Sequence, residues 1–435
     1  MTSTLQSLQK YLEKIKNEDG KINAFLQLNP DAVSEAKKID AKKKKEKLSG
    51  KIIAVKANIN VKGLNASCAS KTLENYKSTY DADVIVKIKD EGGLILGMTN
   101  MDEFASGSSG ETSAFGPTRN PINPNLIPGG SSSGSAAAVS AGFCDMALGS
   151  ETGGSVRNPA SHCGVVGLKP SYGSVSRYGL IDLSMSLDQI GVFAKNVSDA
   201  ALLLSVISEK SENDGTTEET RKINLNEIEK IPKNLTIGIL DFEIGDDDIK
   251  DLIEIKINEA AAKYGWKIKR IKLSILDLAV ETYYPLVYVE FFSGTRRFDG
   301  RKYGKKIEDS AGPEVLRRIL GGSEISKAEY HGRYYDKALK IKKLVEEEFA
   351  KVFKSVDCVI SATVPKLPHK IGEKISVEEM YEYDALTIPA NLAGNCAISI
   401  PVGNLEGIPV GMQIMCDKFK EEKMLQIARS VEKLQ

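Results

Sequence analysis

Histidine is scarce in this sequence, and the chain carries no net charge. Only three histidines occur in 435 residues, at positions 162, 331 and 369, and the motif H-E-x-x-H is absent. These histidines share no metal-ligand spacing, which excludes a zinc hydrolase of the H-E-x-x-H type and predicts no metal site. Lysine plus arginine and aspartate plus glutamate both number 59, so the formal net charge is zero. This balance argues against a chain that wraps nucleic acid.

Paired cysteines and long apolar runs are also absent. The six cysteines form no C-x-x-C motif, and most stand beside small or apolar residues, as buried free thiols do. We therefore expect reduced thiols and a cytoplasmic protein. No stretch reaches 18 apolar residues, and the polar N-terminal sequence MTSTLQSLQKYLEKIKNEDG is not a signal peptide. We expect no membrane segment.

The apolar segments that are present alternate between strand and helix patterns. GKIIAVKANINVKG (50–63) predicts a strand, DADVIVKIKDEGG (81–93) a helix that ends at glycine, and LILGMTN (94–100) a buried strand. Later segments predict a strand at 234–241, a helix and strand over 250–273, a long charged helix at 328–354, a strand at 357–365, and a hairpin from 396–403 and 409–416. This order predicts an α/β fold with a mixed central β-sheet covered by helices.

We expect one large domain over residues 1–435. Its predicted parts are N-terminal helices in 1–49, a core with catalytic loops in 50–192, and the rest of the sheet with a substrate-binding region in 193–435. Within the first part, the charged stretch 30–47 predicts a solvated helix rather than a patch for nucleic acid. The polar stretch 209–230 predicts a surface loop. It could divide two domains, but strands on both sides favour one.

The stretch PGGSSSGSAAAVSAG (128–142) places three serines inside a glycine frame. A flexible linker would lack the apolar AAAVSAG and the nearby CGVVGL, which need burial. A P-loop would need G-x-x-x-x-G-K-[ST], but the stretch contains no lysine. A phosphate site built from backbone N–H groups alone is a weaker alternative. A catalytic loop is the remaining interpretation.

A second Gly-Gly-Ser supports the catalytic interpretation. In GSETGGSVRNPASHCG, Gly153 and Gly154 precede Ser155. Glycines before a nucleophile let backbone N–H groups point at a developing oxyanion. A serine nucleophile also needs a base. We interpret His162, in an irregular stretch, as structural. Lys56 interrupts the apolar strand IIAVKANI and is the candidate base, because burial lowers the pKa of a lysine; an edge-strand lysine with a solvated amine is the alternative.

The order and spacing of Lys56, Ser131 and Ser155 resemble the amidase signature family. The motifs that carry this resemblance are IIAVKANI, PGGSSSGSAAAV, GSETGGSVRNPA, CGVVGLKPSYGSVSRYG and SLDQIGVFA. The resemblance covers about residues 50–415, is strongest over 50–192, and implies the amidase signature fold with a Ser–cis-Ser–Lys triad. In that triad Ser155 attacks an amide carbonyl, and Ser131 passes the proton between Ser155 and Lys56.

Further details follow from the same resemblance. A cis peptide would precede Ser131 after Gly130, and the backbone N–H groups of Thr152, Gly153, Gly154 and Ser155 would form the oxyanion hole. Spacing favours Ser131 over its neighbours Ser132 and Ser133 as the relay.

The chain departs from the family pattern in places, three of them in the motifs around the predicted catalytic residues. Ala57 stands where an acid is common, Ser133 where glycine is common, and Asn158 where glutamine is common. No catalytic group is lost, but we expect the change at Ala57 to affect how Lys56 or its neighbours are held.

Motifs in the C-terminal half resemble one branch of the family, the A subunits of tRNA-dependent amidotransferases. They are TYYPLVYVEFFSGTRRFDGRKYG, PEVLRRILGG and YEYDALTIPANLAG. The resemblance implies a glutaminase that releases ammonia from glutamine, with Tyr284, Arg318 and Asp384 holding the α-amino and α-carboxylate groups. An arginine suits the carboxylate and an aspartate the ammonium. Arg317 is the adjacent competitor for Arg318.

The resemblance also implies partners and leaves alternatives open. A B subunit would hold ATP, magnesium and the misacylated tRNA, a small C subunit would complete a heterotrimer, and this chain would hold no cofactor. The acceptor would be Glu-tRNA(Gln), Asp-tRNA(Asn) or both. A free-standing amidase acting on a small or aryl amide would keep Lys56, Ser131 and Ser155 but would not need Arg318 and Asp384. A scaffold that has lost catalysis is the third hypothesis, against which the intact triad argues.

Overall fold

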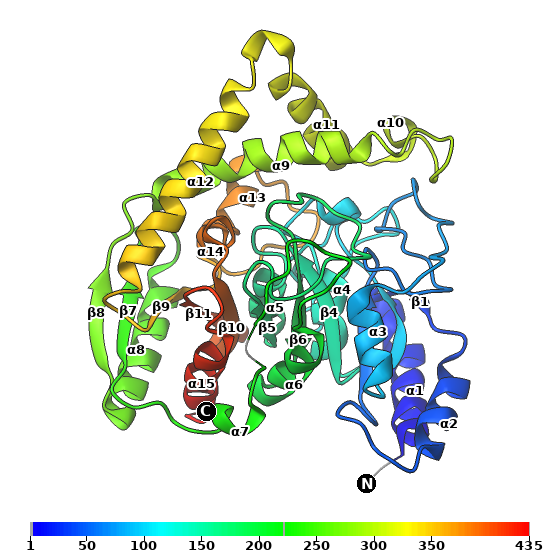
Figure 1. The fold of residues 1–435 in the computed structure, drawn as a ribbon, viewed down its shortest axis with the longest axis horizontal. Helices are drawn as coiled ribbons and strands as arrows, with labels where there is room; N and C mark the ends of the chain where they lie inside the picture. Colours follow the sequence, from blue (N-terminus) through cyan, green and yellow to red (C-terminus); the bar gives the residue numbers. More distant parts are fainter. Residues whose placement is uncertain (1–2, 221, 435) are drawn as a thin grey trace.

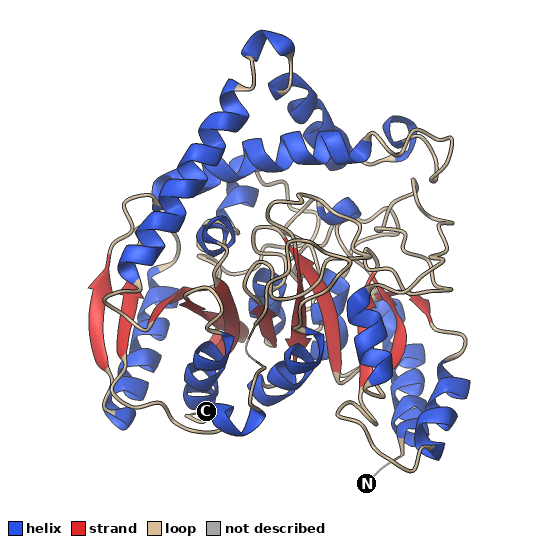
Figure 2. Cartoon of the chain, in the orientation of Figure 1, coloured by secondary structure: helices blue, strands red, loops and turns tan. Residues whose placement is uncertain are grey.

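A computed structural model describes residues 3–220 and 222–434 of the chain. Its centre is an 11-stranded sheet with the order β1-β3-β2-β4-β6-β5-β10-β11-β9-β7-β8 (Figures 1 and 2). Strand β2 pairs in parallel with β3 and β4, whereas β4 pairs antiparallel with β6, so the sheet is mixed. The predicted α/β class with a mixed sheet is confirmed. The strands are β1 (Phe25–Leu28), β2 (Ile52–Lys56), β3 (Leu94–Thr99), β4 (Met146–Glu151), β5 (Val166–Lys169), β6 (Gln189–Ala194), β7 (Thr236–Leu240), β8 (Lys267–Ile271), β9 (Cys358–Ala362), β10 (Cys396–Leu405) and β11 (Ile408–Cys416).

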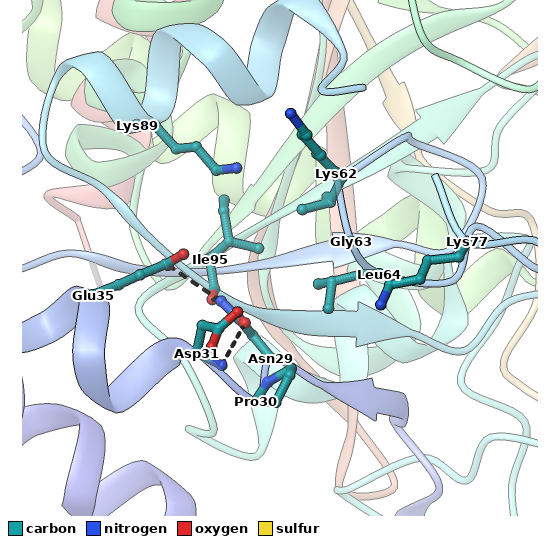
Figure 3. A pocket seen from close by; sticks show the side chains of 11 residues that line it. Asn29, Pro30, Asp31, Glu35, Lys62, Gly63, Leu64, Lys77, Lys89 and Ile95 are labelled. Atoms are coloured by element: carbon teal, nitrogen blue, oxygen red, sulfur yellow. Dashed lines mark hydrogen bonds between the residues drawn. The ribbon is translucent and has the colours of Figure 1, made fainter. Parts of the chain in front are cut away.

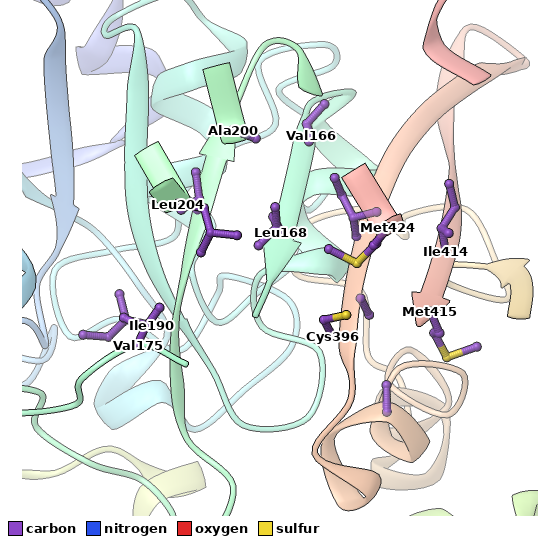
Figure 4. Packing of buried hydrophobic residues seen from close by; sticks show 14 of the residues in the cluster. Val166, Leu168, Val175, Ile190, Ala200, Leu204, Cys396, Ile414, Met415 and Met424 are labelled. Atoms are coloured by element: carbon purple, nitrogen blue, oxygen red, sulfur yellow. The ribbon is translucent and has the colours of Figure 1, made fainter. Parts of the chain in front are cut away.

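Helices cover both faces of this sheet. Side chains alternate between the two faces along each strand, and both faces carry apolar residues that need burial. In β2, Ile52 and Ala54 face a smaller apolar cluster, and Ile53 and Val55 face the larger one. The helices that pack on the smaller cluster are α1 (Thr4–Ile22), α2 (Ala32–Ala41), α4 (Ser133–Ser140) and α5 (Arg157–Cys163). Helices on the larger cluster include α3 (Asp83–Asp90), α6 (Val197–Ile207), α7 (Leu225–Ile228), α8 (Asp247–Tyr264) and α15 (Glu421–Glu432), together with helices of the group described next. Figure 4 draws Leu168, Leu204 and Met424 within this larger cluster.

A third group of helices, from the C-terminal half, lies above the sheet (Figure 1). Helix α9 packs against both α11 and α12, and α14 packs against α9 and α12. The group consists of α9 (Ala279–Thr295), α10 (Ile307–Ser310), α11 (Pro313–Ile325), α12 (Arg333–Val352), α13 (Val377–Glu382) and α14 (Ile388–Ala393). This packing brings the predicted substrate-binding motifs near the strand ends and loops that carry the predicted catalytic residues.

The predicted strands and helices named above are present, with several local differences. The strand predicted over 50–63 is wrong beyond Lys56, where the chain turns. The part predicted as N-terminal helices also contains strand β1, and the helix predicted over 328–354 is a short 3-10 turn followed by α12. The predicted helix over 30–47 is wrong beyond Ala41, where α2 ends and Lys42 adopts an extended backbone. The run of lysines that follows has no apolar side to bury and repels itself. The polar stretch 209–230 is mostly loop but contains the short helix α7; residue 221 lies outside the described residues.

The cysteine and membrane expectations can also be compared with the structure. All six cysteines are buried and free, as the sequence predicts. In the described ranges, no helix combines the length and apolar content that a membrane crossing requires.

Candidate active site

Lys56 is the last residue of β2 and is completely buried. Its Nζ donates hydrogen bonds to Ser131 Oγ at 2.8 Å, to Ser150 Oγ at 2.9 Å and to the Ser150 carbonyl at 3.1 Å. Asn58 Nδ2 donates to the same Ser150 hydroxyl at 2.9 Å. Three oxygens therefore hold the amine in place although Ala57 supplies no carboxylate.

Burial lowers the pKa of Lys56 to about 7, against the opposing effect of the Asp102 and Asp188 carboxylates. The charged form loses its hydration in the interior, so the neutral amine is populated near neutral pH. A neutral amine can accept a proton from the hydroxyl that it contacts. The alternative of an edge-strand lysine with a solvated amine is wrong, since the side chain has no exposed surface.

Ser131 lies in the loop before α4, and the peptide bond between Gly130 and Ser131 is cis. The loop is tightly enclosed, because a Cβ atom at Gly130 would lie 1.9 Å from Asp102 Oδ2. Its two neighbouring serines bond elsewhere: Ser132 Oγ donates to the Ser150 carbonyl at 3.0 Å, and Ser133 Oγ donates to Thr118 Oγ1 at 3.1 Å. Of the three serines, Ser131 is the one whose hydroxyl contacts Lys56.

Ser155 lies in the turn between β4 and α5, next to the loop that carries Ser131. Its carbonyl accepts a hydrogen bond from Ser132 N at 3.2 Å. Its hydroxyl donates to and accepts from no group of the described chain, and the residue keeps 7% of its surface exposed. The hydroxyl is thus accessible to a small substrate and is not engaged in another bond.

The backbone before Ser155 has the features of an anion site. In the described chain, the N–H groups of Thr152, Gly153, Gly154 and Ser155 donate to no protein acceptor. The Thr152 hydroxyl donates to Asp188 Oδ1 at 2.5 Å and so anchors the start of the turn. Adjacent free N–H groups in a turn can stabilise a developing negative charge.

Both glycines of this turn are required by close neighbours. A Cβ atom at Gly153 would lie 2.7 Å from the ring of Tyr283, and one at Gly154 would lie 2.4 Å from Asp384 Oδ1 and from Thr387 Oγ1. The carboxylate of Asp384 is therefore beside the turn that carries Ser155. Burial raises the pKa of Asp384 to about 7, although a hydrogen bond from Asn158 Nδ2 at 3.4 Å opposes this rise.

Helices α9 and α11 place the two other predicted binding residues above this turn. Arg318 is buried, its Nε donates to Glu314 Oε1 at 2.7 Å, and its guanidinium lies 5.9 Å from the ring of Tyr284. Tyr284 stacks on Tyr381 with ring centroids 3.6 Å apart. Arg317 instead donates to the Tyr288 hydroxyl and to Glu314. Arg318 is thus the arginine that faces the interior.

Two cavities can be compared with this site. Neither the predicted catalytic residues nor Arg318 and Asp384 line them, whereas Tyr284 lines the larger one. A cavity of about 960 Å³ is lined by Tyr284 and Tyr381 on one side, with Asp277, Glu281 and Glu378 among its other residues. A smaller cavity of about 120 Å³ lies between the N-terminal segment and the loop after β2 (Figure 3). Lys62 and Lys89 are among the residues that line it. None of the predicted site residues lines the smaller cavity.

The sequence interpretation missed several residues that contact the site. Ser150 holds Lys56, Asp188 anchors Thr152, and Tyr283 rather than Tyr284 touches Gly153. Only the position of Ser150 inside the GSETGGS motif could have indicated it. His162, interpreted as structural, is buried against Tyr383 with ring centroids 5.5 Å apart, and burial lowers its pKa to about 3. Within residues 3–220 and 222–434, no cluster of three acidic, histidine or cysteine side chains is arranged to hold a metal.

A buried amine that contacts a serine hydroxyl, near a second, partly exposed serine beside free N–H groups, suits acyl transfer through serine. The fold and the site thus define an acyl-transfer enzyme. A family model described as Amidase matches residues 6–425, and the chain belongs to the amidase family.

Individual relatives are similar over almost their whole length. The chain is 55% identical to the A subunit of glutamyl-tRNA(Gln) amidotransferase from Methanocaldococcus jannaschii, over 99% of both chains. It is 41% identical to the crystal structure of the Thermotoga maritima subunit of the same name, with a TM-score of 0.87, 99% of this chain covered and 91% of the other. The native peptide amidase of Stenotrophomonas maltophilia is 26% identical, with a TM-score of 0.83, over 100% of this chain and 94% of that one.

Proposed function

We propose that this chain is the glutaminase subunit of a tRNA-dependent amidotransferase that converts Glu-tRNA(Gln) to Gln-tRNA(Gln). The observation that carries the chemistry is the contact of buried Lys56 with Ser131, beside the accessible hydroxyl of Ser155. The choice of substrate is supported by the relatives of that name, which match over nearly the full length of the chain.

In the proposed reaction, Ser155 Oγ attacks the carboxamide carbon of glutamine while Ser131 accepts its proton and donates its own to neutral Lys56. The tetrahedral oxyanion is stabilised by the N–H groups of residues 152–155. The proton then returns through Ser131 to the leaving nitrogen, the C–N bond breaks, and ammonia departs. Water attacks the acyl-enzyme by the same proton route, which releases glutamate and restores the serine.

The proposed grip on glutamine uses the charges above the turn. Arg318 donates to Glu314 through Nε, which leaves its two terminal nitrogens available to donate to the α-carboxylate. Asp384, beside Gly154, would accept from the α-ammonium. An incoming ammonium favours the ionised form of this buried carboxylate. Tyr284 would close one side of the pocket through its stack on Tyr381.

The same proposal includes partners and location. Ammonia would pass to a B subunit that holds ATP, magnesium and the misacylated tRNA, with a small C subunit completing the heterotrimer. This chain would bind glutamine and need no cofactor of its own. Reduced, buried cysteines agree with a cytoplasmic setting.

The test is ammonia release from glutamine by the purified complex. We expect Ser155→Ala to lower the rate by at least about 10⁴-fold while the complex stays assembled, because the acyl-enzyme cannot form. Ser205→Ala, on α6 and outside the site, is the control and should keep the full rate. Ammonia release should rise with partner subunits, ATP and misacylated tRNA. Fast hydrolysis of simple amides, with no response to glutamine or partners, would instead indicate a free-standing amidase.

A further inference from the structure

Two adjacent buried carboxylates follow β3 at the edge of the site. Asp102 and Glu103 keep at most 1% of their surface exposed. Neither forms an ion pair with a lysine or arginine in the described part of the chain. Buried carboxylates without a paired cation are costly unless hydrogen bonds compensate. The hydrogen-bond partners of Asp102 and Glu103 therefore indicate the role of each carboxylate.

Asp102 lies between the loop that carries Ser131 and the loop at residues 110–112. Its carboxylate accepts from Gly110 N at 3.0 Å and from Thr112 N and Oγ1 at 3.1 and 2.9 Å. Its own N–H donates to the Ser131 carbonyl at 3.1 Å. The carboxylate also occupies the space beside Gly130, where a Cβ atom would lie 1.9 Å from Oδ2. Asp102 thus contacts both residues of the Gly130–Ser131 step.

Glu103 binds the helix that carries Arg318. Its Oε2 accepts from Gly312 N at 2.7 Å, and Gly312 is the N-cap residue of α11. Its Oε1 accepts from Ser70 Oγ at 2.5 Å. A negative charge at a helix N-terminus is favourable, and here it also fixes where α11 begins. Arg318 lies in the second turn of this helix.

The backbone between these carboxylates and the next loop is unusual. Phe104 and Ala105 have φ angles of 48° and 57°, in the left-handed region that non-glycine residues rarely adopt. Such backbone conformations are costly for residues with a Cβ atom and persist where the surroundings fix them, often at functional sites. Phe104 packs against Phe291 of α9, with ring centroids 6.3 Å apart, and its N–H donates to the Cys68 carbonyl at 2.9 Å.

We propose that Asp102–Ala105 is a coupling segment that holds the relay serine and the substrate-gripping helix in one fixed relation. Asp102 is a positioning residue for Ser131, and Glu103 is a positioning residue for Arg318 through α11. The inference deepens the proposed function and depends on it for the identity of the substrate. It predicts that the two adjacent carboxylates affect different kinetic parameters.

The experiment measures two reactions of the full complex. Ammonia release from glutamine gives kcat and KM. Sulfonylation of Ser155 by phenylmethanesulfonyl fluoride reports the nucleophile and its proton relay without the amino acid groups that Arg318 would bind. We expect Asp102→Asn to slow sulfonylation and lower kcat at least tenfold, with KM within twofold. The charge of Asp102 raises the pKa of Lys56, so the substitution should lower that pKa. The acidic limb of the variant's pH–rate profile should therefore move to lower pH.

Glu103→Ala should affect substrate binding rather than the nucleophile. We expect KM for glutamine to rise at least tenfold with the sulfonylation rate within twofold. Glu103→Gln can still accept from Gly312 N and donate to Ser70, so it should return KM to within threefold of the parent value. Asp246→Ala is the matched control, since Asp246 accepts from Asp248 N at the start of α8, a helix outside the site. It should lower thermal stability and leave both reactions within twofold.

The outcomes separate the hypotheses. If Asp102→Asn and Glu103→Ala change kcat, KM and sulfonylation in the same proportions, or change none of them, the coupling segment is refuted. If the parent complex is sulfonylated but releases no ammonia from glutamine, the proposed function is refuted, and the sulfonylation rates still decide the role of Asp102.

Discussion

At the scale of single residues, hydrogen-bond partners distinguish Lys56 from the other buried lysine of the sheet. Burial lowers the pKa of Lys169 to about 7 as well. Lys169 Nζ donates to the backbone carbonyls of Pro170 and Asn395, neither of which can deliver a proton. Lys56 contacts two hydroxyls. A lowered pKa is therefore not enough to mark a base; the amine must also contact a group that can give up a proton.

The pKa of Lys56 predicts a pH dependence. A lysine whose pKa is lowered from 10.5 to about 7 becomes neutral as the pH rises through 7, so sulfonylation of Ser155 should increase between about pH 6 and 8 and then level off. A lysine with an ordinary pKa would let the rate climb to about pH 10. Sulfonylation is the better measurement, because Asp384 titrates in the same range and would change glutamine binding. A flat profile would contradict Lys56 as the base.

At the scale of elements, α11 decides between two adjacent arginines. Both contact Glu314, but consecutive helical residues point about 100° apart. Arg318 faces inward. Its charge favours the ionised form of Asp384 and so opposes the rise in the pKa of Asp384 that burial causes. Arg317 lies against the rings of Tyr288 and Tyr381, at 5.6 and 5.7 Å.

A pair of lysine substitutions tests this assignment. Arg318→Lys should raise KM for glutamine by about 10- to 100-fold, because lysine keeps the charge but cannot form the two-pronged bond to a carboxylate. Arg317→Lys is the matched control and should change KM less than threefold. Steady-state ammonia release measures both. A larger effect of Arg317→Lys would make Arg317 the carboxylate-binding residue.

At the scale of the whole molecule, one buried ion pair joins distant parts of the chain. Arg157, at the start of α5, pairs with Glu151 of β4 and donates to Gln413 of β11 and Asn391 of α14. Both charged side chains are fully buried. Burial acts to raise the pKa of Glu151, but the charge and hydrogen bonds of Arg157, together with the charge of Lys169, outweigh it and the pKa falls below its usual value. The pair thus links the strand before Ser155 to the C-terminal part of the sheet.

Breaking this pair should destabilise the whole fold. Arg157→Met leaves Glu151 buried without a counter-charge, and we expect the free energy of unfolding to fall by about 3–5 kcal/mol. The double variant Arg157→Met, Glu151→Gln should recover a large part of the loss. Arg270→Met, which breaks an exposed pair with Glu254, is the control and should cost about 0–1 kcal/mol. Denaturant unfolding measures all three. Equal losses for Arg157→Met and Arg270→Met would contradict the structural role of the buried pair.

Much of the fold was predictable because its signals are local. Apolar runs bounded by glycine mark β2 and β3, and the helix between them ends at its glycines. The end of α2 at Ala41 was missed, since lysine favours helices while repulsion along a run of lysines acts against one. Motif order and spacing also indicated Lys56, Ser131 and Ser155 as the candidate catalytic residues.

The sequence by itself indicated the α/β class, part of the order of strands and helices, the family and the residue types available for catalysis. Only the tertiary structure decided which serine contacts Lys56, which arginine faces inward, and that Ser150, Asp102 and Tyr283 belong to the site. The reason is physical. Secondary structure follows from interactions within a few residues, whereas a hydrogen bond between Lys56 and Ser131 joins side chains 75 positions apart, and only the packed sheet brings them together.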